Sequence, residues 1–193
     1  NYLCCIRTFY KYVRESGYGP NLMEGIHPLP VARNVFAKEP LTLTEAKRLI
    51  SHMRRKAEAR NSTIVDIRNY AIICLLVTTG LRTIEVQNAN RGDIYQSDQA
   101  VRLYKKGKGR ADKNEFVKLS IPVFNLIMDY LSKREDDSEA LFINHSAHGR
   151  KSSDGEMRMR TRSIREMVKS AFYAIGIDSE KKTAHSLRHT AGS

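Results

Sequence analysis

The sequence predicts a mostly α-helical α+β domain with one small antiparallel β-sheet. Apolar residues recur at three- and four-residue spacing over several long segments, which is typical of amphipathic helices. Residues 93–122 change instead to the pattern of short strands. Hydrophobic residues make up 41% of the 193 residues and charged residues 28%, so the chain has enough apolar material for a packed core.

The first 40 residues are expected to lie outside this domain. Residues 2–15 have helical spacing, and Gly17 follows them as a stop. Residues 20–40 contain four of the five prolines and show no periodicity, which indicates an extended linker. We therefore expect residues 1–19 to be the last helix of a preceding domain and residues 41–193 to form the main domain.

The main domain begins with two predicted helices, over residues 42–57 and 64–79. Each starts with a capping-box pattern, at Thr42–Glu45 and at Thr63–Asp66. The second helix is apolar almost all round in its second half, which predicts that it is buried. Gly80 follows at the position where a left-handed residue commonly ends a helix.

Three strands and three more helices are predicted after Gly80. The strands are expected at residues 93–95, 101–104 and 115–119, and residues 105–114 join the last two. The helices are expected at residues 123–134, where Pro122 marks the start, at residues 161–175, and from Ala184 onward. Residues 145–158 are expected to be a loop.

The charge of the chain indicates the kind of partner. Lys and Arg number 33 against 21 Asp and Glu, which gives a net charge of +12 and a pI near 9.8. This excess favours nucleic acid over a membrane surface, although a merely soluble basic protein has the same balance. No apolar run approaches the roughly 18 residues of a membrane span, and no secretory signal is visible. The three cysteines include no C-x-x-C pair, so a cysteine-bound zinc is not expected and a reducing cytoplasm fits better than secretion.

Arg82 is the first candidate site residue. It lies two residues after Gly80, which ends the predicted buried helix, so packing would hold it and aim its guanidinium group into a cleft. Glu85 lies three residues further on and can orient Arg82. The alternative is an ordinary surface Arg–Glu pair.

Lys108 is the second candidate site residue. Gly107 and Gly109 flank it within a basic turn between two predicted strands. Two glycines let the backbone approach a ligand closely and leave the ammonium group free to reach it. The segment is not a P-loop, because the G-x-x-x-x-G-K-[ST] spacing is absent. The alternative is a flexible basic hairpin that binds phosphates without specificity.

His185 and Arg188 complete the candidate set. Their separation by three residues puts them on one face of the last predicted helix, while Leu187 points toward the core. The pair suits an anionic oxygen, because Arg supplies fixed charge and His can move a proton. The alternative is a helix start whose polar residues face solvent. No carboxylate-rich cluster lies near any histidine, so no metal site is predicted.

Taken together, the three motifs resemble those of the tyrosine recombinases, the integrase family of phage, transposon and chromosome-dimer-resolving enzymes. That family shows G-L-R-x-x-E after a buried helix, then a G-K-G hairpin lysine, then H-x-L-R-H at a helix start. Residues 41–193 show the same motifs in the same order. Residues 1–19 are similar to the final helix of the family's N-terminal core-binding domain. The resemblance implies a tyrosine-recombinase-like catalytic domain that is incomplete at its C-terminus.

The resemblance implies site-specific cleavage and rejoining of double-stranded DNA, with neither a metal nor another cofactor. In this family a tyrosine attacks the DNA phosphodiester and forms a 3′-phosphotyrosyl link. Arg82 and Arg188 would clamp the phosphate, Lys108 would protonate the leaving 5′-oxygen, and His185 would assist proton transfer. The full-length protein is expected to act as a tetramer on DNA in the cytoplasm, associated with the nucleoid. Further basic residues are expected to follow the DNA backbone: Arg54, Arg55, Lys56, Lys105, Lys106, Arg110, Arg158, Arg160 and Arg162.

The attacking tyrosine is expected beyond residue 193. The family places it well after the H-x-x-R motif, and none of the nine tyrosines follows His185. Tyr173 lies upstream in a predicted helix, where Phe172 and Ala174 favour a packing role. We therefore expect this chain to lack the nucleophile. Two other interpretations stay open: an inactive DNA-binding module on the same scaffold, and an unrelated basic protein that binds RNA or another protein.

Overall fold

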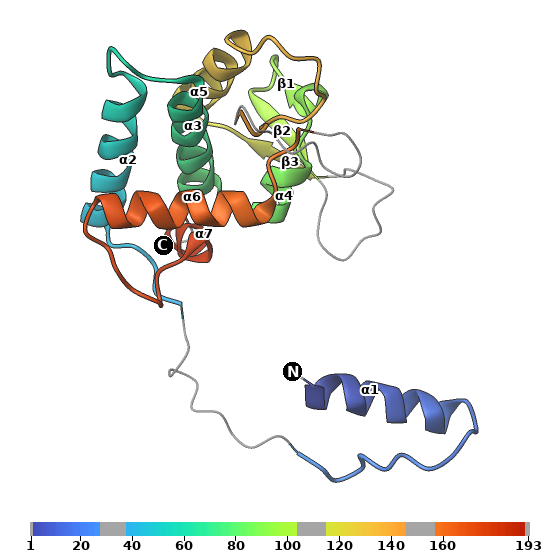
Figure 1. The fold of residues 1–193 in the computed structure, drawn as a ribbon. Helices are drawn as coiled ribbons and strands as arrows, with labels where there is room; N and C mark the ends of the chain where they lie inside the picture. The colour runs from blue at the N-terminus through green and yellow to red at the C-terminus, as the bar shows by residue number, and fades with distance from the viewer. Residues whose placement is uncertain (1, 28–37, 104–114, 146–156, 192–193) are drawn as a thin grey trace. The chain divides into compact units, whose positions relative to one another are not determined.

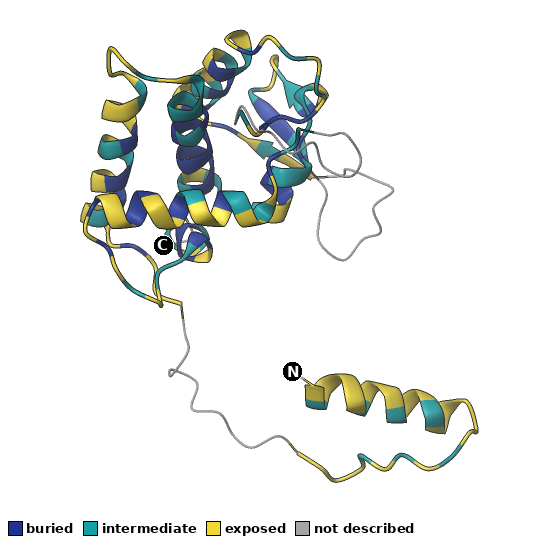
Figure 2. Cartoon of the chain, in the orientation of Figure 1, coloured by how far each residue is buried: buried dark blue, intermediate teal, exposed yellow. Residues whose placement is uncertain are grey.

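The helix α3 (Ile64–Thr79) forms the centre of the hydrophobic core. In the computed structural model, α3 packs against α2 (Leu43–Ala57), α5 (Ile121–Ser132) and α7 (Ala184–Ala191) (Figure 1). Figure 2 shows α3 buried along most of its length, because its apolar side chains face all sides. The prediction of a buried helix that ends before Gly80 is confirmed.

The structure forms two compact units, residues 1–37 and residues 38–193. The first contains α1 (Tyr2–Glu15), which confirms the predicted helix and has no buried residue. Its assignment to a preceding domain stays a prediction. No helix within the described part of the chain is both long and apolar enough to cross a membrane. The residues that the structure describes are 2–27, 38–103, 115–145 and 157–191.

Both predicted capping boxes are present and fix the starts of α2 and α3. The Glu45 carboxylate accepts from the Thr42 amide at 2.8 Å, and the Thr42 hydroxyl accepts from the Glu45 amide at 3.2 Å. Asp66 and Thr63 repeat this arrangement at 3.0 and 3.4 Å. Each box satisfies two amides that a helix start otherwise leaves without partners.

A three-stranded antiparallel sheet packs beside the helices and confirms the predicted fold class. Its order is β1 (Ile94–Tyr95), β2 (Ala100–Leu103) and β3 (Glu115–Lys118). Val101 of the central strand pairs with Ile94 on one side and with Val117 on the other. The segment between β2 and β3, including the predicted strand residue Tyr104, lies outside the described residues.

Two elements differ from the sequence-based prediction. The short helix α4 (Thr83–Asn88) was not predicted, because six residues are too few to show a helical period. The helix α5 begins at Ile121 and ends at Ser132, whereas it was predicted over residues 123–134. Arg134 leaves the helix to donate to the carbonyls of Ala140 and Leu141, at 2.6 and 3.0 Å, and this demand outweighs its helix propensity.

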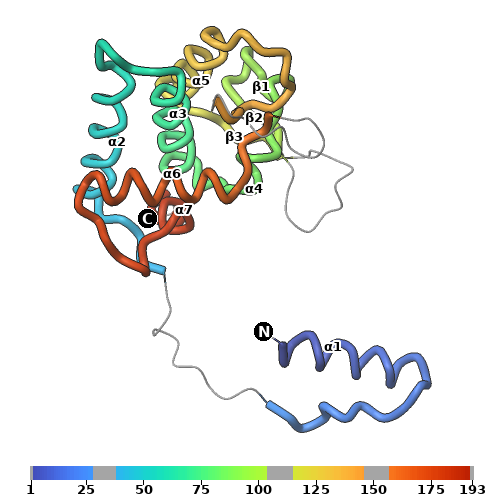
Figure 3. The backbone as a smooth tube through the Cα atoms, in the orientation of Figure 1, coloured from blue at the N-terminus to red at the C-terminus, as the bar shows by residue number. Residues whose placement is uncertain are grey.

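The helix α6 (Thr161–Ala174) agrees with its prediction to within one residue. It lies across the end of the bundle where α2 begins and α3 ends, as the backbone trace shows (Figure 3). Its buried face carries Ile164, Val168 and Phe172, spaced by four. The C-terminal ends of α3 and α6 and the start of α7 are thereby brought to the same end of the domain.

Candidate phosphate-binding site

Gly80 ends α3 in the left-handed conformation, with φ of 64°. Its amide donates to the Leu76 carbonyl at 3.1 Å. A Cβ atom at this position would lie 3.2 Å from the Ala191 Cβ and 3.4 Å from the Arg188 carbonyl oxygen. Glycine is therefore required twice here, for the sign of φ and for the close approach of α7.

Arg82 occupies the N-cap position of α4 and is held by Glu85. The Arg82 amide donates to Glu85 Oε2 at 2.7 Å, and the Arg82 Nη1 donates to Glu85 Oε1 at 2.7 Å. Glu85 is buried, whereas the Arg82 side chain is 38% exposed. The expected orienting role of Glu85 is thus present in the structure, since a buried carboxylate holds a partly exposed guanidinium group.

His185 and Arg188 extend from α7 toward the same region. Arg188 Nη1 donates to the Gly80 carbonyl at 2.6 Å, which ties the guanidinium group to the end of α3. The His185 ring meets the His189 ring edge to face, with centroids 4.7 Å apart. Leu187 is fully buried, as its position in the motif predicts.

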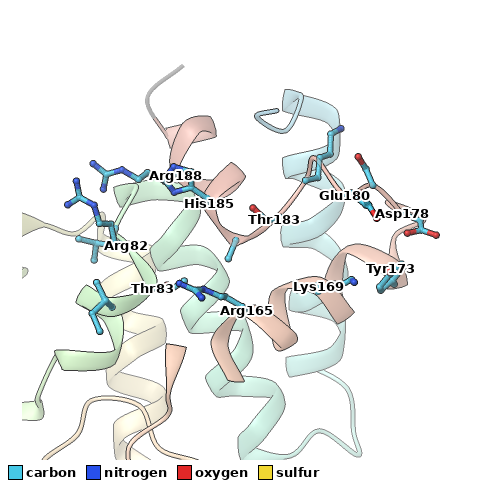
Figure 4. A pocket seen from close by; sticks show the side chains of 15 residues that line it. Arg82, Thr83, Arg165, Lys169, Tyr173, Asp178, Glu180, Thr183, His185 and Arg188 are labelled. Carbon is cyan, nitrogen blue, oxygen red and sulfur yellow. The ribbon is translucent and has the colours of Figure 1, made fainter. Parts of the chain in front are cut away.

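The three candidate residues of the described chain line one cavity of about 740 Å³. Figure 4 shows the guanidinium groups of Arg82 and Arg188 at the same end of this cavity, with His185 beside them. Their predicted convergence is confirmed, although roughly 100 residues separate Arg82 from the other two. The cavity is lined by Leu81, Arg82, Thr83, Ile84, Arg165, Lys169, Tyr173, Asp178, Ser179, Glu180, Lys182, Thr183, Ala184, His185 and Arg188.

The electrostatic environment of His185 favours the neutral imidazole. Partial burial lowers its pKa, and the positive potential of His189, Arg188 and Arg82 lowers it further. A His with a pKa below 6.5 is mostly uncharged at neutral pH and can accept a proton. This end of the cavity therefore combines two fixed positive charges with one neutral base, a combination that suits an anion undergoing proton transfer.

A second cavity, of about 400 Å³, adjoins the first through Arg82 and Arg188. Leu103 at the end of β2 and Glu115 at the start of β3 also line it. These strand ends flank the segment that carries Lys108. The predicted site residues Lys105, Lys106, Lys108 and Arg110 themselves lie outside the described residues.

The larger cavity is also lined by side chains of α6 that sequence reasoning did not assign to the site. Arg165, Lys169 and Tyr173 follow one another at four-residue spacing along α6. Tyr173 is 48% exposed, and the Lys169 ammonium lies 5.4 Å from its ring centroid. The expected packing role of Tyr173 is wrong, because Phe172 fills the core in its place. The signal available in the sequence was that each of the three residues directly follows a residue of the buried face, so they share one stripe beside it.

Three predicted DNA-contact residues lie away from this site, at the C-terminal end of α2. Arg54 pairs with Glu58 at 3.3 Å, and Lys56 pairs with Asp66 at 3.7 Å. Asp66 belongs to the first turn of α3, so about 20 Å of helix separates it from Gly80. Arg54, Arg55 and Lys56 thus form a separate basic surface, and their contact with DNA stays a prediction.

The predicted DNA-contact residues near the start of α6 differ in how far they are exposed and in what they contact. Arg158 donates to the carbonyls of Gln87 and Ala89, at 2.8 and 3.1 Å, so it already holds a loop. Arg160 is exposed at the N-cap, and Arg162 is exposed and pairs with a glutamate one turn later at 2.8 Å. Among the described residues, no group of three or more His, Cys, Asp or Glu side chains is placed to hold a metal ion.

Comparison with known proteins agrees with the resemblance to tyrosine recombinases that the sequence motifs indicate. Residues 39–193 match the model of the phage integrase family. The chain is 28% identical to the tyrosine recombinase XerC of Caldanaerobacter subterraneus subsp. tengcongensis, over 96% of this chain and 47% of that protein. The chain therefore spans about half the length of this relative.

Two solved structures share the fold. The crystal structure of XerA recombinase superposes with a TM-score of 0.60 at 24% identity, over 98% of this chain and 57% of that one. The Tn1549 transposon integrase, in complex with circular intermediate DNA, superposes with a TM-score of 0.65 at 16% identity, over 95% of this chain and 60% of that one. Because the family model covers most of the sequence and the fold agrees, the chain belongs to the phage integrase family of tyrosine recombinases.

Proposed function

We propose that this chain is the DNA-cleaving portion of a site-specific recombinase, which breaks and rejoins duplex DNA through a 3′-phosphotyrosyl intermediate. The observation that carries the proposal is the convergence of Arg82, His185 and Arg188 on one cavity in a member of this family. The solved Tn1549 integrase is bound to DNA, which supports DNA as the partner. The net charge of +12 agrees with a polyanionic ligand.

The two arginines would bind the nonbridging oxygens of the scissile phosphate. Glu85 holds one nitrogen of Arg82, and the Gly80 carbonyl holds one nitrogen of Arg188. A guanidinium group carries five N–H donors, so each arginine keeps further donors while one anchor fixes its direction. Negative charge grows on these oxygens in the transition state, where fixed donors stabilise it most.

The two proton transfers would be divided between His185 and Lys108. The attacking tyrosine oxygen forms a bond to phosphorus, and its proton passes to the neutral imidazole of His185. The bond from phosphorus to the 5′-oxygen then breaks, and that oxygen takes a proton from Lys108. The cavity at the base of the Lys108 segment supports this role, since Arg82 and Arg188 line it. The phosphotyrosyl link conserves the bond energy, so rejoining is the same step in reverse.

We propose that the attacking tyrosine follows residue 193. Tyr173 is the tyrosine that lines the cavity, but it stands at the opposite end from Arg82 and Arg188 (Figure 4). A group that attacks the bound phosphate must lie about 3 to 3.5 Å from phosphorus, which the arginine end would hold. The tyrosine at position 173 therefore fits a peripheral role better than that of nucleophile.

A nicked suicide substrate tests the proposal, because loss of the short cut strand traps the covalent intermediate. The 193-residue chain should bind this DNA without forming an adduct, whereas a chain extended past the next tyrosine should form one. Tyr173→Phe in the extended chain should leave the adduct unchanged. An adduct with the 193-residue chain that Tyr173→Phe abolishes would make Tyr173 the nucleophile. Binding without any adduct in the extended chain would leave a DNA-binding module only.

Assembly on DNA is the last part of the proposal. Strand exchange joins two duplexes and four cut strands, so we propose that four copies of the full-length protein act together. The basic surface formed by Arg54, Arg55 and Lys56 would contact the DNA backbone outside the cavity. Sedimentation of the extended chain with a duplex site should show four protein copies for every two duplexes.

A further inference from the structure

The loop that leads into α7 is bound to the segment that opens the same unit. The Glu39 amide donates to the Lys181 carbonyl at 3.3 Å, and the Lys38 ammonium donates to the Glu180 carbonyl at 2.8 Å. The Lys181 ammonium also pairs with the Glu39 carboxylate at 3.1 Å. The two stretches run side by side in the backbone trace (Figure 3). The start of the unit and the approach to the site are therefore joined directly.

One contact of this segment reaches the C-terminal half of α7. The Leu41 amide donates to Thr190 Oγ1 at 2.9 Å, and the same hydroxyl donates to the Ser186 carbonyl at 2.9 Å. Leu41 is buried in the core, so its amide is a fixed point. Thr190 lies two residues after Arg188, and this bond restrains the turn of α7 that carries the guanidinium group.

Another contact reaches Lys182, two residues before the start of α7. Lys182 pairs with Glu45 Oε1, while Glu45 Oε2 accepts from the Thr42 amide at 2.8 Å. Both side chains of the pair are largely buried, with 15% of Lys182 and 21% of Glu45 exposed. The pKa of Glu45 lies below its ordinary value, chiefly because Lys182 donates to it. Lys182 lines the cavity three residues before His185, so the pair fixes the start of the site helix.

We propose that Glu45 and Thr190 are positioning residues, which hold the two ends of α7 so that its site side chains face the cavity. We call the contacts Glu45–Lys182 and Leu41–Thr190 the clasp. The helix α7 has only eight residues, about 12 Å, so a restraint at each end determines its tilt. A shift of about 1 Å in a catalytic group can lower a rate by up to about 100-fold. The predicted change in cleavage rate rests on the proposed function, whereas the predicted position of α7 rests only on the contacts described above.

The two capping boxes supply a matched pair of variants. Glu45→Gln and Asp66→Asn each neutralise a carboxylate in the first turn of a helix, and each carboxylate pairs with a lysine. Only Glu45 also touches the approach to α7. Both variants should lose stability in urea unfolding, and Glu45→Gln should lose more because its lysine partner is largely buried. Only Glu45→Gln should disturb the site.

The first readout uses the 193-residue chain and NMR titration of the His185 ring, identified by the signal that His185→Asn removes. Glu45→Gln should shift the ring resonance and its titration midpoint, and Asp66→Asn should leave both unchanged. The second readout is the single-turnover rate of strand cleavage in the extended chain. Glu45→Gln should lower the maximal rate about 10-fold and leave unchanged the DNA concentration that gives half of that rate. Asp66→Asn should preserve the rate.

Equal effects of the two variants on His185, or no effect of either, would overturn the clasp. If Glu45→Gln fails to fold, Thr190→Val provides the second variant, because it keeps the shape and removes the hydroxyl that accepts from Leu41. It must also shift the His185 signal. An extended chain that never cleaves DNA contradicts the proposed function alone, since the NMR comparison tests the clasp without any reaction.

Discussion

Two arginine–carboxylate pairs in this domain have opposite uses. The Arg134 side chain is fully buried, and its donors go to the Asp136 carboxylate and to the carbonyls of Ala140 and Leu141. Arg82 gives a single side-chain nitrogen to Glu85 among the bonds within the described residues, and the rest of its side chain lines a cavity. The pair of Arg134 and Asp136 stabilises a loop, whereas Glu85 holds the charge of Arg82 at the cavity. What separates them is the number of N–H donors already committed to the protein.

Arg158 and Arg188 repeat the contrast. Arg158 Nη1 donates to two carbonyls and its Nη2 to Asn90 Oδ1 at 2.8 Å, so it holds the chain between α4 and the sheet. Arg188 uses Nη1 for the Gly80 carbonyl and lines both cavities. A single anchor fixes the direction of a guanidinium group while it remains able to bind a ligand. Stability and activity should therefore depend on different arginines.

Replacement of Arg188 by Ala should produce the largest effect. Strand cleavage by the extended chain should fall about 1000-fold, because a fixed donor to the transition-state phosphate is lost. The free energy of unfolding should change by less than about 1 kcal/mol, since the side chain is only partly buried. Single-turnover cleavage and urea unfolding measure the two quantities. A large loss of stability with a normal rate would place Arg188 in the same class as Arg134.

Replacement of Arg134 by Met should reverse this result. The free energy of unfolding should drop by about 3 kcal/mol, because the buried carbonyls of Ala140 and Leu141 lose their donor. Met preserves most of the apolar stem, which limits any cavity. Cleavage measured well below the unfolding temperature should remain within a few-fold of normal. Loss of cleavage without loss of stability would contradict the structural role of Arg134.

Asp136 gives the same pair a dependence on pH. Its pKa lies near 2, chiefly because Arg134 donates to it, whereas the ordinary value is 3.8. A carboxylate with a lowered pKa stabilises the folded state above its ordinary pKa, and this contribution is lost as the pH falls toward 2. Asp136→Asn should therefore cost about 2 kcal/mol at pH 7 and much less at pH 2. Urea unfolding at both pH values checks this, and a constant difference would contradict it.

The sequence was sufficient for the elements whose signals are local. The two capping boxes set the starts of α2 and α3, and Gly80 sets the end of α3. Each of these signals lies within a few residues of the helix end that it defines. The order of the motifs indicated that Arg82, His185 and Arg188 would meet. Each of these predictions relied on neighbours in sequence or on resemblance, and neither requires knowledge of packing distances.

The sequence does not predict which distant groups the long side chains contact. Arg158 and Arg82 are both arginines near polar segments, but one meets backbone carbonyls from residues about 70 positions away. No local pattern encodes that contact. The same holds for Lys182, whose partner Glu45 lies 137 residues earlier. Tyr173 is a further example. Helical spacing predicts the face of α6 on which it lies, but the cavity beside that face depends on the packing of other elements.

The smallest expected effect concerns the anchor of Arg188. Gly80 and Gly176 both follow helices with positive φ, 64° and 76°, so alanine is strained at either position. Only at Gly80 would the added Cβ meet neighbours, with Ala191 at 3.2 Å and the Arg188 carbonyl oxygen at 3.4 Å. At Gly176 nothing lies within 4 Å of the added atom. The pair thus separates backbone strain from the packing of α7.

Gly176→Ala should cost about 1 kcal/mol in the free energy of unfolding and leave cleavage unchanged. Gly80→Ala should cost somewhat more, because α7 must move by a few tenths of an ångström to admit the methyl group. That movement shifts Arg188 relative to the Gly80 carbonyl that orients it, so the cleavage rate should fall several-fold at an unchanged DNA affinity. Equal rates for the two variants would mean that α7 moves without altering Arg188. In that case the single anchor, rather than the packing of the helix, sets the direction of the guanidinium group.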